Sequence, residues 1–238
     1  MNDVGMQPVI VLGAGGNSLD LLETLRALQQ LGRGPSLHCI GILDDDAAKW
    51  GSRIDDVEVL GGLERASDYP QAVFASALGS TRNYWRKAEI LARTGVQRTR
   101  FITVIDPTAS VSPSAQLGVG SLILQNATVT ARARIGDHVM VLPNSIVSHH
   151  AEVGDYSTIA GGVCISGNVR VGQHCYLGSN CTIRNGLLLG DGCLIGMGSV
   201  VLQDVPPGAV VAGNPARLLR QGHVTESTNK TEESVASE

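Results

Sequence analysis

Aromatic residues are scarce in this 238-residue chain: Phe, Trp and Tyr make up 3% of it, whereas glycine occurs 29 times. Large rings usually dominate the energetics of a globular core, so their scarcity favours a narrow interior of aliphatic and small side chains. No apolar run is long enough to span a membrane, and no charged and then apolar leader opens the sequence. We therefore expect a cytoplasmic protein without a membrane partner.

Charge and cysteine content exclude two further classes. The formal net charge of −4 provides no basic surface for nucleic acid. The five cysteines lack the paired spacing of a metal site, so we predict no bound metal. The length allows one large domain or two modest ones.

A strict six-residue repeat occupies the second half of the chain. From Ile105 to Val201 every sixth residue is Ile, Val or Leu, without insertion or slip. The residue four positions after each of these is almost always Ala, Ser or Cys. A short fixed period indicates a solenoid, since neither a helix nor a simple strand repeats at six residues.

We interpret the repeat as a triangular coil, in which three units of a short strand and a turn complete one circuit. Residues eighteen apart would then stack at about 4.8 Å, the spacing of neighbouring strands. The aliphatic residues would fill the interior, with the small residues in the tight positions beside them. The third residue after most aliphatics is Gly, Asn or His, which tolerate a left-handed backbone at least cost; this turn column includes Gly120, Asn126, His138, Asn144, His150, Asn168, His174 and Asn180.

Three cysteines, Cys175, Cys181 and Cys193, fall in the column of small residues. We expect them to be buried and to act as small hydrophobic side chains. Cys175 and Cys193 stand one circuit apart and could meet, but a reducing compartment argues against a disulfide.

The first hundred residues predict an α/β unit. An apolar strand, a glycine-rich turn, an amphipathic helix and a second strand ending in acidic residues follow one another, which is the order of half a Rossmann fold. We place the domain boundary near residue 103, with a Rossmann-like domain at 1–102, the coil at 103–220 and a polar, disordered tail at 221–238. The predicted elements before the coil are strands at 8–12, 39–43, 57–60 and 72–78, and helices at 18–31 and from after Gly79 to about residue 94. Residues 101–105 lead into the coil.

The glycine-rich turn is a candidate phosphate site. Gly13, Gly15 and Gly16 precede the predicted helix, and glycines there let the backbone approach a phosphate at the helix start. The pattern departs from GxGxxG at Ser18, so glycines that only shape the turn remain the alternative.

The repeat separates one histidine from the other five. Three histidines occupy the turn column (His138, His150 and His174), and two lie outside the coil (His38 and His223). His149 lies in the coil but outside the turn column, so the repeat does not require a histidine there. The residues one circuit before and after it, Ala131 and Gly167, are small and leave space over the ring. An exposed imidazole with room for a ligand suits a general base, and a surface histidine without a role is the alternative.

Several segments resemble bacterial nucleotide-sugar acetyltransferases grouped with the sialic acid O-acetyltransferases, whose hexapeptide repeats form a left-handed β-helix. The resemblance implies a small α/β Rossmann-like domain followed by an all-β left-handed parallel β-helix. It covers the whole chain, and the repeat itself is typical of acyl-CoA transferases. The resembling segments are residues 13–16, 43–45, 78–80, 146–149, 166–169 and 212–217.

The resemblance also implies partners and roles. The protein would be a homotrimer, with a nucleotide-sugar acceptor on the α/β domain and acetyl-CoA in the groove between neighbouring coils. His149, with His150 beside it, would take a proton from the sugar amine as the amine attacks the thioester, and the Gly167 N–H would hold the developing oxyanion. The implied acceptor residues are Gly13, Gly15, Gly16, Asn17, Asp44, Asp45 and Gly79. The implied acetyl-CoA residues are Thr158, Gly167, Ser179, Met197, Asn214, Pro215 and Arg217.

Three positions differ from the family pattern. His150 stands where an acidic residue usually follows the catalytic histidine, and two adjacent imidazoles would disfavour double protonation. Thr158 replaces a histidine that meets acetyl-CoA, and Asn17 replaces a histidine common in the glycine loop.

Alternatives to amine acetylation remain. O-acetylation of a sialic acid or another sugar hydroxyl is the nearest, but a hydroxyl is a weaker nucleophile and needs a better base than a histidine without an acidic partner. A non-catalytic scaffold or nucleotide-binding regulatory subunit is a second alternative. A trimeric zinc enzyme of the γ-carbonic-anhydrase kind is a third, and it would need several histidines to converge across subunits.

Overall fold

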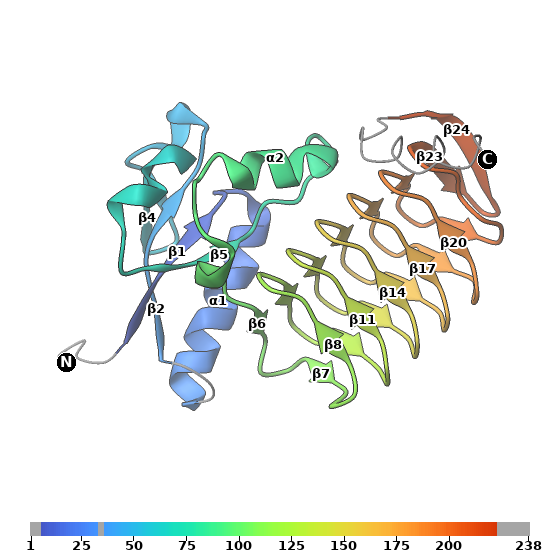
Figure 1. Cartoon of the computed structure of the whole chain (residues 1–238), viewed down its shortest axis with the longest axis horizontal. Coiled ribbons are helices and arrows are strands. Elements are labelled where there is room, and N and C mark those ends of the chain that lie inside the picture. Colours follow the sequence, from blue (N-terminus) through green and yellow to red (C-terminus); the bar gives the residue numbers. More distant parts are fainter. Residues whose placement is uncertain (1–5, 33–35, 223–238) are drawn as a thin grey trace, which may run out of the picture.

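The computed structural model describes residues 6–32 and 36–222, which form an α/β part followed by a long coil (Figure 1). The predicted disordered tail begins too early, because Gln221 ends the last strand and pairs with Ala209. The rest of that predicted tail, from residue 223 onward, lies outside the described residues.

The α/β part is built on a five-stranded sheet with the order β3-β4-β2-β1-β5. Neighbouring strands are parallel except for β3 and β4, which form an antiparallel pair. The predicted strands of this part are present, with β5 shorter than expected. The bounds are β1 (Gln7–Leu12), β2 (Leu37–Leu43), β3 (Arg53–Ile54), β4 (Val57–Gly61) and β5 (Val73–Ser76).

The helices differ from prediction at their ends. Helix α1 (Gly16–Leu31) begins before the expected Ser18, because Gly15 already serves as its N-cap. The second predicted helix is reduced to α2 (Lys87–Ala92), and the turn before it buries Tyr84, whose hydroxyl donates to the carbonyl of Gly192 at 3.2 Å. The 3-10 turns are η1 (Ala47–Lys49), η2 (Leu63–Asp68), η3 (Tyr84–Arg86) and η4 (Arg98–Arg100).

The second half is the predicted coil, with three parallel sheets as its faces. Away from the ends of the coil, each two-residue strand pairs with the strands eighteen residues before and after it; Ile146, for example, pairs with Thr128 and with Cys164. The first face, which meets the α/β part, contains β6 (Val104–Ile105), β9 (Leu122–Ile123), β12 (Met140–Val141), β15 (Thr158–Ile159), β18 (Tyr176–Leu177), β21 (Leu194–Ile195), β23 (Ala209–Gly213) and the antiparallel β24 (Ala216–Gln221).

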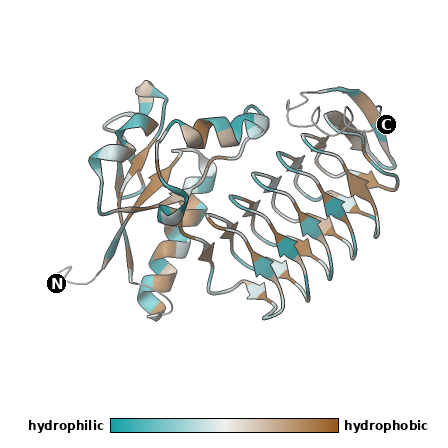
Figure 2. Ribbon diagram, viewed as in Figure 1, coloured by the Kyte–Doolittle hydropathy of each residue, from teal (hydrophilic) through white to brown (hydrophobic). Residues whose placement is uncertain are grey.

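Two further faces complete the triangle. The second face contains β7 (Ser110–Val111), β10 (Thr128–Val129), β13 (Ile146–Val147), β16 (Cys164–Ile165), β19 (Thr182–Ile183) and β22 (Val200–Val201). The third contains β8 (Gln116–Leu117), β11 (Arg134–Ile135), β14 (Glu152–Val153), β17 (Arg170–Val171) and β20 (Leu188–Leu189). This third face carries mostly hydrophilic residues on its outer side, along β8, β11, β14 and β17 (Figure 2).

The turn column has the left-handed backbone that the sequence predicts. Every residue of the column from Gly120 to Gly198 has a φ between 53° and 73°. Arg132 and Tyr156 adopt it as well, although neither is Gly, Asn or His. The position in the repeat, and not the residue type, therefore dictates this conformation.

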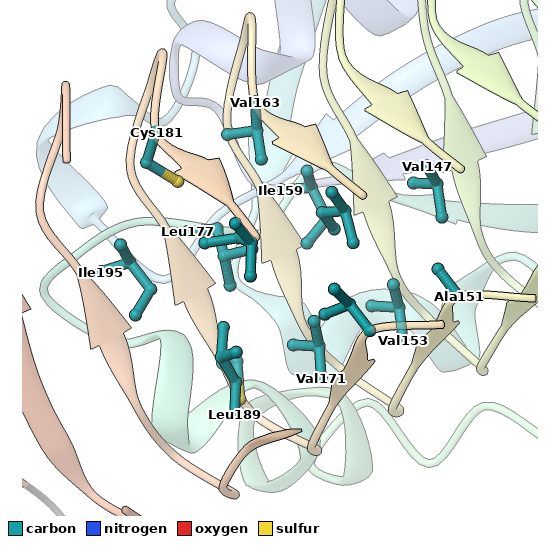
Figure 3. Packing of buried hydrophobic residues seen from close by; sticks show 14 of the residues in the cluster. Val147, Ala151, Val153, Ile159, Val163, Val171, Leu177, Cys181, Leu189 and Ile195 are labelled. Carbon is teal, nitrogen blue, oxygen red and sulfur yellow. The ribbon is translucent and has the colours of Figure 1, made fainter. Parts of the chain in front are cut away.

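Aliphatic side chains fill the coil interior as predicted, among them Ile159, Leu177 and Ile195 (Figure 3). The first residue of the column is an exception, since Ile105 is 38% exposed at the open end of the coil. The cysteines of the small column are buried and free, and the sulfur atoms of Cys175 and Cys193 lie 3.6 Å apart. The predicted burial of these cysteines is confirmed.

The two parts of the chain share a hydrophobic core. One cluster of buried residues joins Val9 and Leu22 of the α/β part to Leu122 and Met140 on the first face of the coil. Lys87 adds a polar contact, because it is buried and its Nζ donates to the carbonyl of His138 at 2.6 Å. The α/β part is therefore packed against the first face of the coil and held there.

Candidate active site

The glycine-rich turn opens a cleft at the N-terminus of α1. Gly13 has a φ of 99°, and a β-carbon there would lie 2.9 Å from Cδ2 of Leu78, so only glycine fits the turn well. Gly15 and Gly16 differ, because β-carbons on them would meet no heavy atom within 4 Å. These two glycines therefore border open space where the first N–H groups of the helix are available to an anion.

The two aspartates after β2 line the same cleft, but their carboxylates already hold the chain in place. Asp44 accepts the N–H groups of Ala14 at 2.6 Å and Asp46 at 2.9 Å. Burial alone would raise the pKa of Asp44, but these N–H groups and the ammonium of Lys49, 3.2 Å away, lower it below its usual value. Asp44 is thus a fixed anion that shapes the glycine turn.

Asp45 is the more accessible of the pair. One of its oxygens accepts the N–H of Leu63 at 3.1 Å, and the other lies 2.9 Å from Nη1 of Arg93. Its side chain is 36% exposed, against 14% for Asp44. Asp45 therefore retains lone pairs that a ligand in the cleft can reach.

Asn17 joins the start of α1 to the loop after β5. Its side-chain amide donates to the carbonyl of Gly79 at 3.0 Å. Gly79 in turn lies against the coil, since a β-carbon there would be 2.8 Å from Oγ1 of Thr158 and 3.0 Å from the sulfur of Met140. All seven predicted acceptor residues border one cleft of about 600 Å³: Gly13, Gly15, Gly16, Asn17, Asp44, Asp45 and Gly79.

The cleft also contains residues that sequence reasoning missed. Lys49 and Arg82 bring positive charge to it, and Tyr176 reaches it from the first face of the coil. Lys49 follows Asp44 closely enough in sequence to suggest a pair on the same loop. Tyr176 reaches the cleft only because of the way the coil packs against the α/β part, and no local sequence pattern predicts that packing.

His149 lies in the turn between the second and third faces of the coil and is exposed. Its ring covers Gly167, where a β-carbon would lie 2.5 Å from Cε1 and 2.7 Å from Nε2 of the imidazole. The ring therefore occupies the space that the missing side chain of Gly167 leaves. Nδ1 of His149 lies 3.2 Å from Nδ1 of His150, so the predicted pair of imidazoles is in hydrogen-bond contact.

His149 does not border the cleft of its own chain, and the predicted acetyl-CoA residues divide between different places. Gly167 lies in the same corner as His149, whereas Ser179 and Met197 lie in the turns between the first and second faces. Met197 is 80% exposed, as a contact residue requires. The second face of the coil separates the two groups.

The remaining predicted acetyl-CoA residues lie elsewhere. Thr158 is fully buried under Gly79, and its Oγ1 has no hydrogen-bond partner among the described residues. It therefore offers no free surface to a cofactor in this conformation. Asn214, Pro215 and Arg217 lie in and after the exposed hairpin that joins β23 and β24 at the end of the coil.

Two structural findings bear on the excluded classes. Across the described residues, no three His, Cys, Asp or Glu side chains gather as a metal site would require. None of the described helices has both the length and the apolar character needed to cross a membrane.

Two family models match consecutive parts of the coil. The model of the bacterial transferase hexapeptide (six repeats) matches residues 132–167, and that of the hexapeptide repeat of succinyl-transferase matches residues 168–203. No curated protein matches the chain. The coil and its repeats define a hexapeptide transferase.

Solved structures match almost the whole chain. The acetyltransferase domain of PglB from Neisseria gonorrhoeae FA1090, also solved with acetyl-CoA, is 31% identical, with 90% of this chain and 100% of that chain covered and a TM-score of 0.77. PerB from Caulobacter crescentus, solved with CoA and GDP-perosamine, is 25% identical over 90% and 97% of the two chains, with a TM-score of 0.75. WeeI from Acinetobacter baumannii AYE is 27% identical over 90% and 100%, also at 0.75. The chain belongs to this family of bacterial hexapeptide-repeat acetyltransferases and is an acyltransferase.

Proposed function

We propose that this protein transfers the acetyl group of acetyl-CoA to the amine of a nucleotide-linked amino sugar, with His149 as the general base. The observation that carries the proposal is the exposed imidazole held over Gly167 in a chain that aligns along 90% of its length with PerB, which is named a perosamine N-acetyltransferase. The amine, and not a sugar hydroxyl, is favoured because that relative is an N-acetyltransferase. A non-catalytic scaffold would not require this clearance around one histidine.

The cleft at the start of α1 suits the nucleotide diphosphate of the acceptor. The N–H groups at Gly15 and Gly16 and the positive end of the helix attract phosphate oxygens. Lys49 and Arg82 border the same cleft and add positive charge. Asp45, with its free lone pairs, is the candidate to accept hydrogen bonds from the base or the ribose.

A homotrimer would unite the cleft with His149. In one protomer the second face of the coil separates the His149 corner from Ser179 and Met197. A neighbouring coil placed against this face would bring one subunit's His149 corner to the other subunit's Met197 corner and cleft. The outer side of the second face is suited to such packing, since it carries small or apolar residues such as Thr128, Ile146 and Cys164.

Acetyl-CoA would lie in the groove between the two coils. Ser179 and Met197 would line it from one subunit and Gly167 from the other, with Asn214, Pro215 and Arg217 at its far end. Thr158 lies beneath Gly79, next to the acceptor cleft, so it would support the loop that carries Gly79 without touching the cofactor. Such an enzyme would work in the cytoplasm.

The chemical step follows from the position of the ring. The lone pair of the neutral sugar amine forms a bond to the thioester carbonyl carbon while Nε2 of His149 accepts the amine proton. The Gly167 N–H would stabilise the oxyanion that develops. When the C–S bond breaks, the proton passes from the imidazolium to the CoA sulfur, which leaves the N-acetyl product and free CoA.

The test is a transfer assay with acetyl-CoA and a panel of UDP-, dTDP- and GDP-linked amino sugars, in which release of CoA and the mass of the product are measured. We expect one or more amino sugars to be N-acetylated and their hydroxyl analogues to be inert. His149→Asn should abolish transfer while gel filtration with light scattering still reports a trimer. Full turnover by His149→Asn, or acetylation of hydroxyl analogues only, would overturn the proposal.

A further inference from the structure

The contact between His149 and His150 has a consequence for the state of the base. Their Nδ1 atoms lie 3.2 Å apart, and their ring planes meet at 84°. A hydrogen bond at this distance needs one N–H and one lone pair, because two lone pairs or two N–H groups repel each other. Exactly one of the two Nδ1 atoms therefore carries a hydrogen.

The backbone that carries both rings is fixed relative to the coil. The N–H of His150 donates to the carbonyl of Ala131 at 3.1 Å, and the N–H of Asn168 donates to the carbonyl of His149 at 3.1 Å. His150 also has the left-handed φ of the turn column, 58°. The turn that presents the pair is thus held by the circuits on both sides of it.

The other surroundings of His150 form a separate groove of about 250 Å³ on the third-face side of the corner. Arg132 and Arg134 contribute positive charge to it and Glu152 negative charge, with Glu152 lying 3.6 Å from Nη1 of Arg134. The uncharged Ser114 and Gln116 complete the lining. No carboxylate among the described residues is hydrogen-bonded to either imidazole, so the two rings are each other's partners.

We infer that His150 is a positioning residue, which accepts the Nδ1–H of His149 and thereby keeps the lone pair of His149 on Nε2, the nitrogen beside Gly167. This inference rests on the proposed function of His149 as base. The opposite arrangement, with the hydrogen on Nδ1 of His150, would place a hydrogen on Nε2 of neutral His149 and leave it unable to accept a proton there.

The arrangement remains intact through the reaction. When Nε2 of His149 accepts the amine proton, the imidazolium still donates Nδ1–H to the lone pair of His150, and this hydrogen bond becomes charge-assisted. After Nε2 returns its proton to the leaving CoA sulfur, the original tautomers are restored. His150 therefore stabilises the cation without gaining or losing a proton.

Substitutions at residue 150 separate this role from a role in the turn. Glycine occupies the same column at Gly162 and Gly186, so His150→Gly keeps the turn and removes the acceptor. Asparagine also fits the column, and its Oδ1 stands close to where Nδ1 of histidine would be, so His150→Asn restores an acceptor. Asn126→Gly changes another exposed residue of the column to glycine, away from His149, and is the control.

The experiment measures kcat and KM as functions of pH, together with the ¹⁵N chemical shifts of the imidazole of His149 in the full-length protein. We expect His150→Gly to lower kcat about tenfold or more with little change in either KM, and to shift His149 towards the Nε2–H tautomer. His150→Asn should recover much of kcat, His150→Glu should move the acidic limb of the profile to higher pH, and Asn126→Gly should match the wild type.

The outcomes distinguish this inference from the proposed function. If His149→Asn is inactive but His150→Gly keeps the wild-type kcat, pH profile and His149 tautomer, the role of His150 is refuted and the base stands. If His149→Asn retains full turnover, the proposed base is wrong and the inference fails with it.

Discussion

The imidazole of His149 lies directly against the α-carbon of Gly167 in the next circuit of the coil, with 2.5 Å between its Cε1 and the place of a β-carbon on that glycine. Gly167 is not among the residues with positive φ, so its backbone conformation is open to other residues. Only the absence of a side chain at residue 167 lets the ring lie where it does.

Gly167→Ala should therefore displace His149 without disturbing the coil. Because the new methyl group conflicts with a side chain and not with the backbone, we expect kcat to fall by about tenfold to a hundredfold, with a melting temperature close to that of the wild type. Equal activity of Gly167→Ala and the wild type would contradict the position assigned to His149.

Substitutions at Gly15 should affect the acceptor alone. A β-carbon there points into the open cleft, so Gly15→Ala should weaken binding of a nucleotide sugar and Gly15→Leu should abolish it, while both variants still bind CoA. Isothermal titration with each ligand measures the two affinities. Loss of CoA binding together with acceptor binding would show that the two ligands do not occupy separate places.

The left-handed turns predict a difference between alanine and glycine. Asn126 has a φ of 56° and is exposed. In this left-handed conformation the backbone of an alanine is strained by about 1 kcal/mol or more. Asn126→Ala should therefore lower the free energy of unfolding by about that amount, whereas Asn126→Gly should stay close to the wild type. Chemical denaturation of the three proteins decides the matter, and equal losses for both variants would point to a side-chain contact instead.

Lys87 predicts a pH-dependent stability. Burial lowers the pKa of Lys87 from 10.5 to about 7, so between these values the unfolded chain binds more protons at this residue than the folded chain. The free energy of unfolding should then rise with pH across that window, by at most about 1.4 kcal/mol per pH unit from this group. Lys87→Met should remove this part of the slope in urea denaturation between pH 7 and 10, and identical slopes would contradict the assignment.

The coil was predictable because its register depends on one local rule repeated many times. The interior column and the turn column follow from the six-residue period, and even Arg132 and Tyr156 obey the conformation of their position. Helix ends were less predictable. The segment from Gly79 to about residue 94 was predicted as one helix, but it contains the 3-10 turn η3, with Tyr84 buried against the coil, and the short helix α2.

The candidate site was predictable only in part, since some of it depends on how distant segments meet. The glycine turn and Asp44 follow one another along a strand–helix–strand unit, so the sequence reveals their proximity. Tyr176 reaches the cleft, and Thr158 lies hidden under Gly79, because the α/β part rests on the first face of the coil. The periodicity of the sequence does not predict how the α/β part packs on the coil.

The buried cluster that joins Val9 and Leu22 to Leu122 and Met140 means that the two halves of this enzyme are not interchangeable modules. A chimera joined near residue 103 would combine a foreign α/β part with a coil face whose side chains do not fit it. Apolar side chains on both parts would then be left poorly packed at the interface.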